Sequence, residues 1–299
     1  MWWKIGTVRD DAWQSTEGPW SDRPSSEGVA SEGVASPEWP WHGSAGELEE
    51  LQVRLAAAAG SALAADPWVL SGAARFGGCF VVHRRGVAGP GRAGDRVWAA
   101  AVVWERPAGA AVRARRADRH LRGAAPATRG HPRQADDVLA QAVLSAEVPA
   151  PYRPGLLAAR EGAVLAGALA ALGVHPDVVL VDASGLDHPR HAGLAVHLGA
   201  ATGMPTVGVT RRPMVASGLL PELHRGARSP LLLDGRCVAY WVCTKDGVQP
   251  VVAHAGWRTS PETSVRVVLE ASTPAARTPV PLQEARRVAR EARSLADRR

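Results

Sequence analysis

Residues 178–190 read VVLVDASGLDHPR, and this stretch decides the fold class of the chain. Four apolar residues predict a buried strand that delivers the carboxylate of Asp182 to its C-terminal end. A glycine-containing turn and the segment 188–190 (His-Pro-Arg) follow at once. Because ligands of open α/β sheets gather outside the carboxyl ends of the strands, we expect a metal or substrate site at Asp182.

A second segment with similar chemistry lies upstream. PYRPG (151–155) leads into an expected helix over 155–172, and this helix carries Arg160 and Glu161. Two acids on adjacent elements, beside basic residues, indicate metal-assisted chemistry on a phosphate.

These two segments resemble the endonuclease V family of deoxyinosine-specific nucleases. The resembling segments are PYRPGLLAARE (151–161), VVLVDASGLDHPRHAGLAVHLG (178–199), MPTVGVTRR (204–212) and CVAYWVCTKDGVQPVVAHAGWRTSPETS (237–264). The resemblance is strong over residues 138–290 and loose over 44–105. It implies an α/β protein with a ribonuclease H-like mixed β-sheet that is flanked by helices.

The pattern of apolar residues and turn signals agrees with that fold class. Ser44 and Glu47 form a capping box that opens a helix, and three hairpin-like strands precede an alternation of helices and strands. The expected strands are 80–82, 97–104, 138–148, 178–182, 205–209, 237–243 and 250–254. The later expected helices are 155–172, 191–202 and 261–270, and the stretch 281–299 is compatible with a helix.

The sequence predicts a single domain with irregular additions. Residues 1–43 contain a direct repeat and scattered Trp, so we expect a disordered or low-complexity arm before an endonuclease V-like domain at 44–290. The Arg-rich insert 106–137 lacks an apolar period, which favours a solvated loop, with a phosphate-contacting arm as the alternative. Residues 291–299 form an expected basic tail.

Composition favours a polyanionic partner and excludes two classes of protein. The net charge of +6 suits nucleic acid, although the excess of Arg over Lys is also typical of a GC-rich coding sequence. No apolar run approaches the roughly 18 residues of a membrane span, and the N-terminus lacks the apolar region of a secretion signal. The three cysteines form no metal-ligand pattern. We therefore expect a reduced, cytoplasmic protein that is a monomer and does not contact a membrane.

The resemblance assigns Glu161 and Asp182 to the family's metal site. Oxygen ligands of this kind suit Mg²⁺, with Mn²⁺ as an alternative. The family's third acid lies on its first strand, and the aligned residue here is Ala74 or Phe80, of which the second register suits the apolar strand better. Neither residue supplies a carboxylate, and Asp95 would have to approach from the side.

Two further positions depart from the family pattern. A Gly-Val-Ala-Lys segment becomes Gly-Val-Thr-Arg, which ends at Arg211, and a Gly-His-Arg segment becomes Gly-Trp-Arg, which ends at Arg258. We expect Arg211 to take part in catalysis and both arginines to hold phosphate. The loss of a single such catalytic group costs on the order of 3 kcal/mol of transition-state stabilisation.

The segments for recognition are closer to the family pattern. Pro151, Tyr152 and Pro154 match a wedge that separates the strands, and two prolines stiffen it. The resemblance implies that the extruded base is read by backbone groups of the turn at Gly185 and Leu186.

His188 and Arg190 also match family positions. The resemblance predicts that they contact phosphate or support the metal.

Two functions follow as hypotheses. The first is a metal-dependent endonuclease for DNA repair that recognises deoxyinosine, or inosine in RNA, and cuts a nearby phosphodiester on its 3′ side. The alternative is a catalytically impaired homologue that binds inosine-containing or distorted nucleic acid without cutting it. The missing acid on the first strand separates the two hypotheses.

Overall fold

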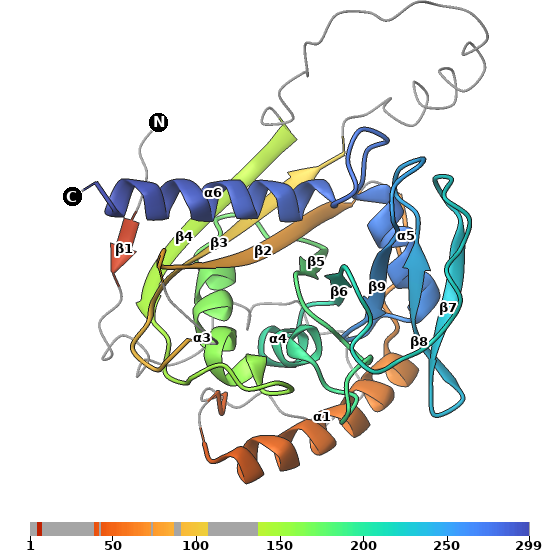
Figure 1. Cartoon of the computed structure of the whole chain (residues 1–299), viewed down its shortest axis with the longest axis horizontal. Helices are drawn as coiled ribbons and strands as arrows, with labels where there is room; N and C mark the ends of the chain where they lie inside the picture. Colours follow the sequence, from red (N-terminus) through yellow and green to blue (C-terminus); the bar gives the residue numbers. More distant parts are fainter. Residues whose placement is uncertain are drawn as a thin grey trace, which may run out of the picture.

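The structure is a computed structural model that describes residues 5–7, 39–41, 43–72, 74–86, 91–106 and 137–298. Its strands form one nine-stranded mixed sheet in the order β1-β4-β3-β2-β5-β6-β9-β8-β7 (Figure 1). The strands are β1 (Ile5–Thr7), β2 (Arg75–His83), β3 (Arg96–Glu105), β4 (Val138–Glu147), β5 (Val178–Val181), β6 (Thr206–Thr210), β7 (Arg228–Leu233), β8 (Arg236–Val242) and β9 (Val251–Ala255). The helices are α1 (Ala45–Ala65), α3 (Leu157–Ala170), α4 (Leu194–Thr202), α5 (Pro261–Glu270) and α6 (Val280–Ala296).

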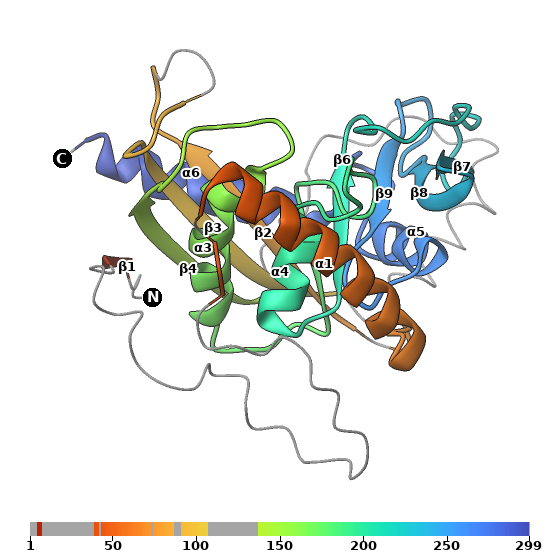
Figure 2. The ribbon, with the colours of Figure 1, turned by 90° about the horizontal axis from the view of Figure 1, so that it is seen from below.

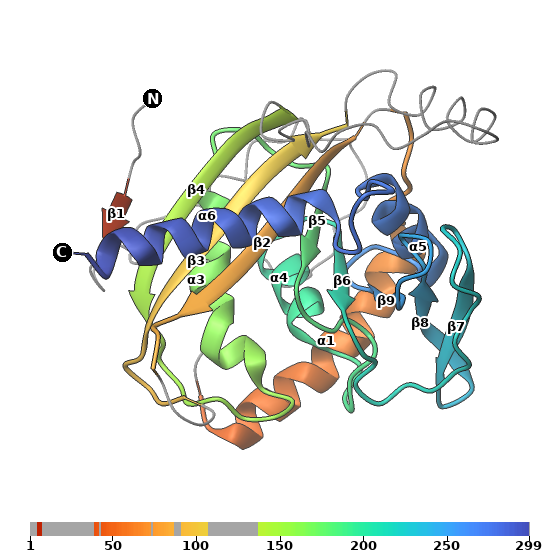
Figure 3. The same ribbon diagram turned by 45° about the horizontal axis from the view of Figure 1, so that its top comes forward.

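Helices cover both faces of the sheet. Figures 1 and 2 show α1, α3 and α4 on one face, and Figure 3 shows α6 running across β2 and β3 on the other. The side chains of β5 alternate between the two cores: Val179 and Val181 pack with α3 and α4, whereas Val178 and Leu180 pack with α5 and α6. Burial on both faces explains why β5 is a continuous apolar run rather than an alternating one.

The predicted fold class is confirmed, and most predicted elements are present. The capping box of α1 is formed as expected, and Ser260 caps α5, whose first residue is a proline. β7 was not predicted, because Pro230 interrupts it and its side chains are mostly exposed. It lies at an edge of the sheet, where a proline is tolerated in a strand.

Described residues at both ends of the predicted domain contact its core. The predicted boundary at 290 falls inside α6. Of the predicted N-terminal arm, Ile5–Thr7 pairs in parallel with β4, and Trp41 is buried over Gly162 of α3. The rest of the arm, and residues 107–136 of the predicted insert, lie outside the described residues.

None of the helices in the described part of the chain is long and apolar enough to cross a membrane. Cys79, Cys237 and Cys243 are all free.

Candidate nucleic-acid interface

Asp182 lies at the tip of β5, next to a phenylalanine of β2. Cys79 of β2 pairs with Val181 of β5 in parallel register, so the next residues along the two strands are Phe80 and Asp182. Phe80 packs with α6, and alternation along β5 directs Asp182 to the same face of the sheet. The structure therefore places Phe80, not Ala74, beside the acid, as the favoured register predicts.

The environment of Asp182 combines partial burial with opposing charges. Its side chain is exposed at the strand tip, yet the surrounding protein removes enough water to raise its pKa, and the carboxylate of Glu161 raises it further. Arg286 and Arg211 act in the opposite direction and lower the pKa of Asp182. Two guanidinium groups and a second acid therefore act electrostatically on this carboxylate.

Glu161 reaches the site from α3 and is held by a histidine. Its Oε1 atom accepts a hydrogen bond from His83 Nε2 at 2.9 Å, while His83 Nδ1 lies 3.3 Å from Arg160 Nη2. Because a guanidinium only donates, His83 accepts at Nδ1 and carries its hydrogen at Nε2. Burial is the largest of the effects that raise the pKa of the Cys79 thiol. The negative charges of Asp182 and Glu161 raise it further.

Asp95 contributes to the site only indirectly. It accepts hydrogen bonds from the amide of Arg92 at 2.6 Å and from Arg160 Nη2 at 3.0 Å, so its carboxylate serves the buried Arg160. The pKa of Asp95 is lowered most by the hydrogen bond from the amide of Arg92. The hydrogen bond from Arg160 has the next largest effect. Asp95 therefore does not replace the missing acid.

The fold family implies a divalent metal, and the donor set can be tested against it. Among the described residues, no group of three or more His, Cys, Asp and Glu side chains is placed to hold a metal ion. Of the two acids, Glu161 is bound to His83 and Asp182 lies close to Arg286 and Arg211. Two carboxylates that already face fixed cations or donors do not fit a metal centre held by the protein alone.

The predicted wedge is exposed and anchored at its end. Residues 151–154 are all exposed, and the side chain of Tyr152 projects into solvent. The chain then turns at Gly155, whose φ of 80° favours glycine. The Gly155 carbonyl accepts hydrogen bonds from Gln52 Nε2 at 2.8 Å and from His188 Nε2 at 3.0 Å. The wedge is therefore fixed to α1 and to the segment that follows Asp182.

His188 and Arg190 position the wedge. His188 is 2% exposed and accepts at Nδ1 from the amide of Arg190, so its Nε2 hydrogen is donated to Gly155. Burial lowers the pKa of His188 to about 4, which keeps the ring neutral. Arg190 donates to Gln52 and lies 3.6 Å from Glu49. Both ring nitrogens of His188 are engaged inside the protein, and the contact with phosphate or support of the metal predicted for it stays a prediction.

The turn after Asp182 is packed against β9. The amide of Leu186 donates to the carbonyl of Ala255 at 2.8 Å, and the carbonyl of Gly185 accepts from Gly193 at 2.9 Å. A Cβ at Gly185 would overlap the carbonyl oxygen of Ala255. The glycine thus serves close packing within the protein, and the Leu186 amide predicted to read a base is already bound.

The two arginines predicted to hold phosphate differ in their surroundings. Arg211 is exposed and acts on Asp182. Arg258 is bound through Nε and Nη2 to Asp66 at the end of α1, and its predicted phosphate contact stays a prediction. Among the described residues, Arg211 has no ion-pair partner and so keeps a free charge at the site.

Three polar residues that support the site were not predicted. Gln52 links α1 to the wedge, and the fully buried Asp187 accepts hydrogen bonds from the amides of residues 214–216 at 2.7–2.9 Å. His254 lies 3.5 Å from Asp187 and 2.7 Å from Thr210 Oγ1. Asp187 lies in a glycine-containing turn, and this sequence signal could have identified it as a site residue. Gln52 and His254 lie in segments without such a signal.

The fold and the paired acids define a ribonuclease H-like α/β protein. A sequence model described as Endonuclease V matches residues 95–287, and the chain belongs to this family. It is 45% identical over 121 residues to "Endonuclease V" of Streptomyces coelicolor and 38% identical over 137 residues to that of Roseiflexus sp.. The matches cover 40% and 46% of this chain, and the chain spans only 52% and 62% of those relatives.

Solved structures of the same family share the fold. The endonuclease V of Streptomyces avermitilis superposes with a TM-score of 0.67 at 30% identity, covering 86% of this chain and 96% of the other. The catalytic domain of human endonuclease V gives 0.62 at 27% identity, covering 84% and 98%. A Ciona intestinalis endonuclease V in complex with DNA containing an inosine followed by a ribo-adenosine gives 0.58 at 19% identity, covering 83% and 96%, and this likeness concerns the fold alone.

Proposed function

We propose that the chain recognises inosine-containing nucleic acid by the wedge at 151–154, which is held beside the turn at 184–186, and that it binds without efficient cleavage. The observation that carries this proposal is the bond between His188 and the Gly155 carbonyl. It holds an exposed, proline-stiffened segment in a fixed position relative to Asp182 and the turn that follows it. A preorganised wedge lowers the cost of separating strands at a weakly paired base.

The chemistry of the site supports binding more than hydrolysis. Phe80 stands where a third carboxylate would complete the donor set, and Arg286 and Arg211 supply fixed positive charge near Asp182. The family's Ciona relative was crystallised with inosine-containing DNA, which supports the same class of ligand for this chain.

Hydrolysis of a nearby phosphodiester on the 3′ side, with Mg²⁺ or Mn²⁺ and a role in DNA repair, is the second candidate. The exposure of Asp182 and its electrostatic interaction with Glu161 favour it, because two acids on adjacent elements are retained. Arg211 would then hold the phosphate that is cut.

The test uses the full chain and a fluorescein-labelled duplex with one inosine, against the same duplex with adenine at that position. Fluorescence anisotropy in EDTA should show tighter binding to the inosine duplex, and added Mg²⁺ or Mn²⁺ should produce little nicking. Equal affinity for both duplexes would overturn the recognition proposal. Nicking that disappears in Asp182→Asn, while binding persists, would establish the second candidate instead.

A further inference from the structure

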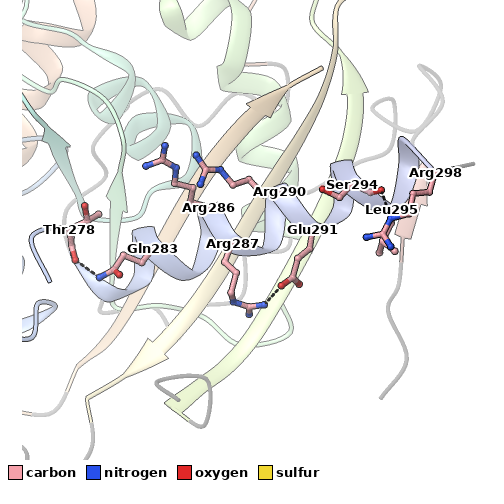
Figure 4. A pocket seen from close by; sticks show the side chains of 9 residues that line it. All are labelled: Thr278, Gln283, Arg286, Arg287, Arg290, Glu291, Ser294, Leu295 and Arg298. Atoms are coloured by element: carbon pink, nitrogen blue, oxygen red, sulfur yellow. Dashed lines mark hydrogen bonds and ion pairs between the residues drawn. The ribbon is translucent and has the colours of Figure 1, made fainter. Parts of the chain in front are cut away.

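Helix α6 presents arginines of two kinds around a hollow of about 710 Å³ (Figure 4). Arg287 is neutralised, because it binds Glu284 and Glu291 at 2.8 Å each. Arg286 and Arg290 lie one helical turn apart and extend to the opposite side of the helix from Arg287 (Figure 4). Neither of them has an ion-pair partner among the residues that the structure describes.

Arg286 is held in place but keeps unused hydrogen-bonding capacity. Its Cζ atom lies 5.3 Å from the ring centroid of Phe80, a distance at which a guanidinium is attracted to an aromatic face. Its buried Nε atom has no hydrogen-bond partner in the described part of the chain. That atom is shielded from solvent, but the guanidinium has further N–H donors, and an oriented group with such donors indicates a place for an acceptor.

The same guanidinium lies close to the tip of β5. Phe80 follows Cys79, which pairs with Val181, so the ring below Arg286 is next to Asp182 across the two strands. Arg286 is also the strongest charged influence on that carboxylate. A fixed cation therefore stands at the end of β5, with Arg290 exposed one turn further along α6.

We propose that Arg286 and Arg290 bind a backbone phosphate of the nucleic acid that the wedge engages, so that fixed guanidinium charge replaces a divalent cation at this site. Guanidinium groups bind phosphate oxygens through two parallel hydrogen bonds, and such bonds need no metal. The inference rests on the proposed function, because it assumes that a nucleic acid lies along the turn and the wedge.

The test measures binding of the inosine duplex and of its adenine-containing control in EDTA, over a series of salt concentrations. The variants are Arg286→Gln and Arg290→Gln, and Arg287→Gln is the control with the same charge change on the same helix. Each of the first two should weaken binding to both duplexes by roughly fivefold to tenfold and reduce the salt slope by about 1. Arg287→Gln should leave both quantities close to those of the unaltered chain.

The outcomes separate this inference from the proposed function. If the chain prefers the inosine duplex but Arg286→Gln and Arg290→Gln behave like Arg287→Gln, the phosphate site is wrong and the recognition proposal stands. If both variants weaken binding but the chain shows no inosine preference, the phosphate site stands and the recognition proposal fails. Arg290 is exposed, so its variant remains informative even if Arg286→Gln perturbs the packing on Phe80. Binding that requires Mg²⁺ would overturn the metal-independent site.

Discussion

The Nε2 hydrogen of His83 is donated to Glu161 Oε1 across 2.9 Å, and this bond ties the acid of α3 to the end of β2. The opposite ring nitrogen lies 3.3 Å from Arg160, whose charge is balanced by Asp95 at 3.0 Å. The orientation of Glu161 therefore depends on a buried ion pair that lies on the far side of the histidine.

Replacing Asp95 with alanine should destabilise the protein more than the loss of an exposed carboxylate does. Arg160 is 3% exposed, and removal of its carboxylate partner leaves a buried charge without compensation. Glu147→Gln is the control, because it removes a carboxylate from the exposed 4.0 Å pair with Arg96 and should cost less than about 1 kcal/mol. Urea unfolding measures both changes, and equal losses in the two variants would contradict the assigned role of Asp95.

The sequence predicted most of the strands and the start of α1 because both have short-range signals. The apolar run of β5 and the capping box at Ser44 each act within a few residues. The strand register that places Phe80 beside Asp182 also followed from the apolar pattern of β2.

The contacts that decide the role of each polar side chain could not be predicted in this way. Arg258 binds Asp66, which is 192 residues distant in sequence, and Gln52 binds Gly155 across 103 residues. Such pairs arise from packing of α1 on the rest of the domain and leave no local pattern. The resemblance predicted a phosphate contact for Arg258, and a phosphate contact or support of the metal for His188, from residue types alone and without their partners.

Stability should fall as the pH drops below about 6.5. Burial lowers the pKa values of His188 and His254 to about 4 and that of His197 to about 3. Between those values and the pKa of about 6.5 in the unfolded chain, the unfolded state binds more protons, so acid favours unfolding. In this pH range, each histidine lowers the free energy of unfolding by up to about 1.4 kcal/mol for each unit by which the pH falls. At pH 8 none of them affects it.

His197→Phe should make the free energy of unfolding less dependent on pH, because one of the three buried histidines is then absent. His197 lies beside Trp39 and Trp41, where another aromatic ring can pack, and its ring nitrogens have no hydrogen-bond partner among the described residues. Urea unfolding at pH 7 and pH 5 measures the slope, and His224→Gln is the control because its side chain is 63% exposed. An unchanged slope in His197→Phe would show that this histidine is not the neutral buried group described here.

Gly185→Ala should destabilise the turn and reduce the preference for inosine. The new Cβ would overlap the Ala255 carbonyl, and relief of such a clash costs about 1–3 kcal/mol. Gly173→Ala is the matched control: nothing lies within 4 Å of its Cβ position, so it should be neutral or stabilising by about 0.4–1 kcal/mol. Thermal unfolding and the anisotropy assay measure the two effects, and an unaltered inosine preference in Gly185→Ala would argue against recognition by this turn.

The double variant Phe80→Asp, Arg286→Ala should gain affinity for Mn²⁺. A carboxylate at position 80 would lie next to Asp182 across parallel strands, and removal of Arg286 prevents that carboxylate from forming an ion pair instead. Hard divalent cations bind clustered carboxylate oxygens, so affinity should rise roughly tenfold or more. The paramagnetic resonance signal of unbound Mn²⁺ reports binding, and Phe80→Asn, Arg286→Ala is the control that changes shape without adding charge. If the control binds Mn²⁺ as well as the double variant does, release of Asp182 from Arg286 is sufficient, and the missing carboxylate is not what keeps the metal out.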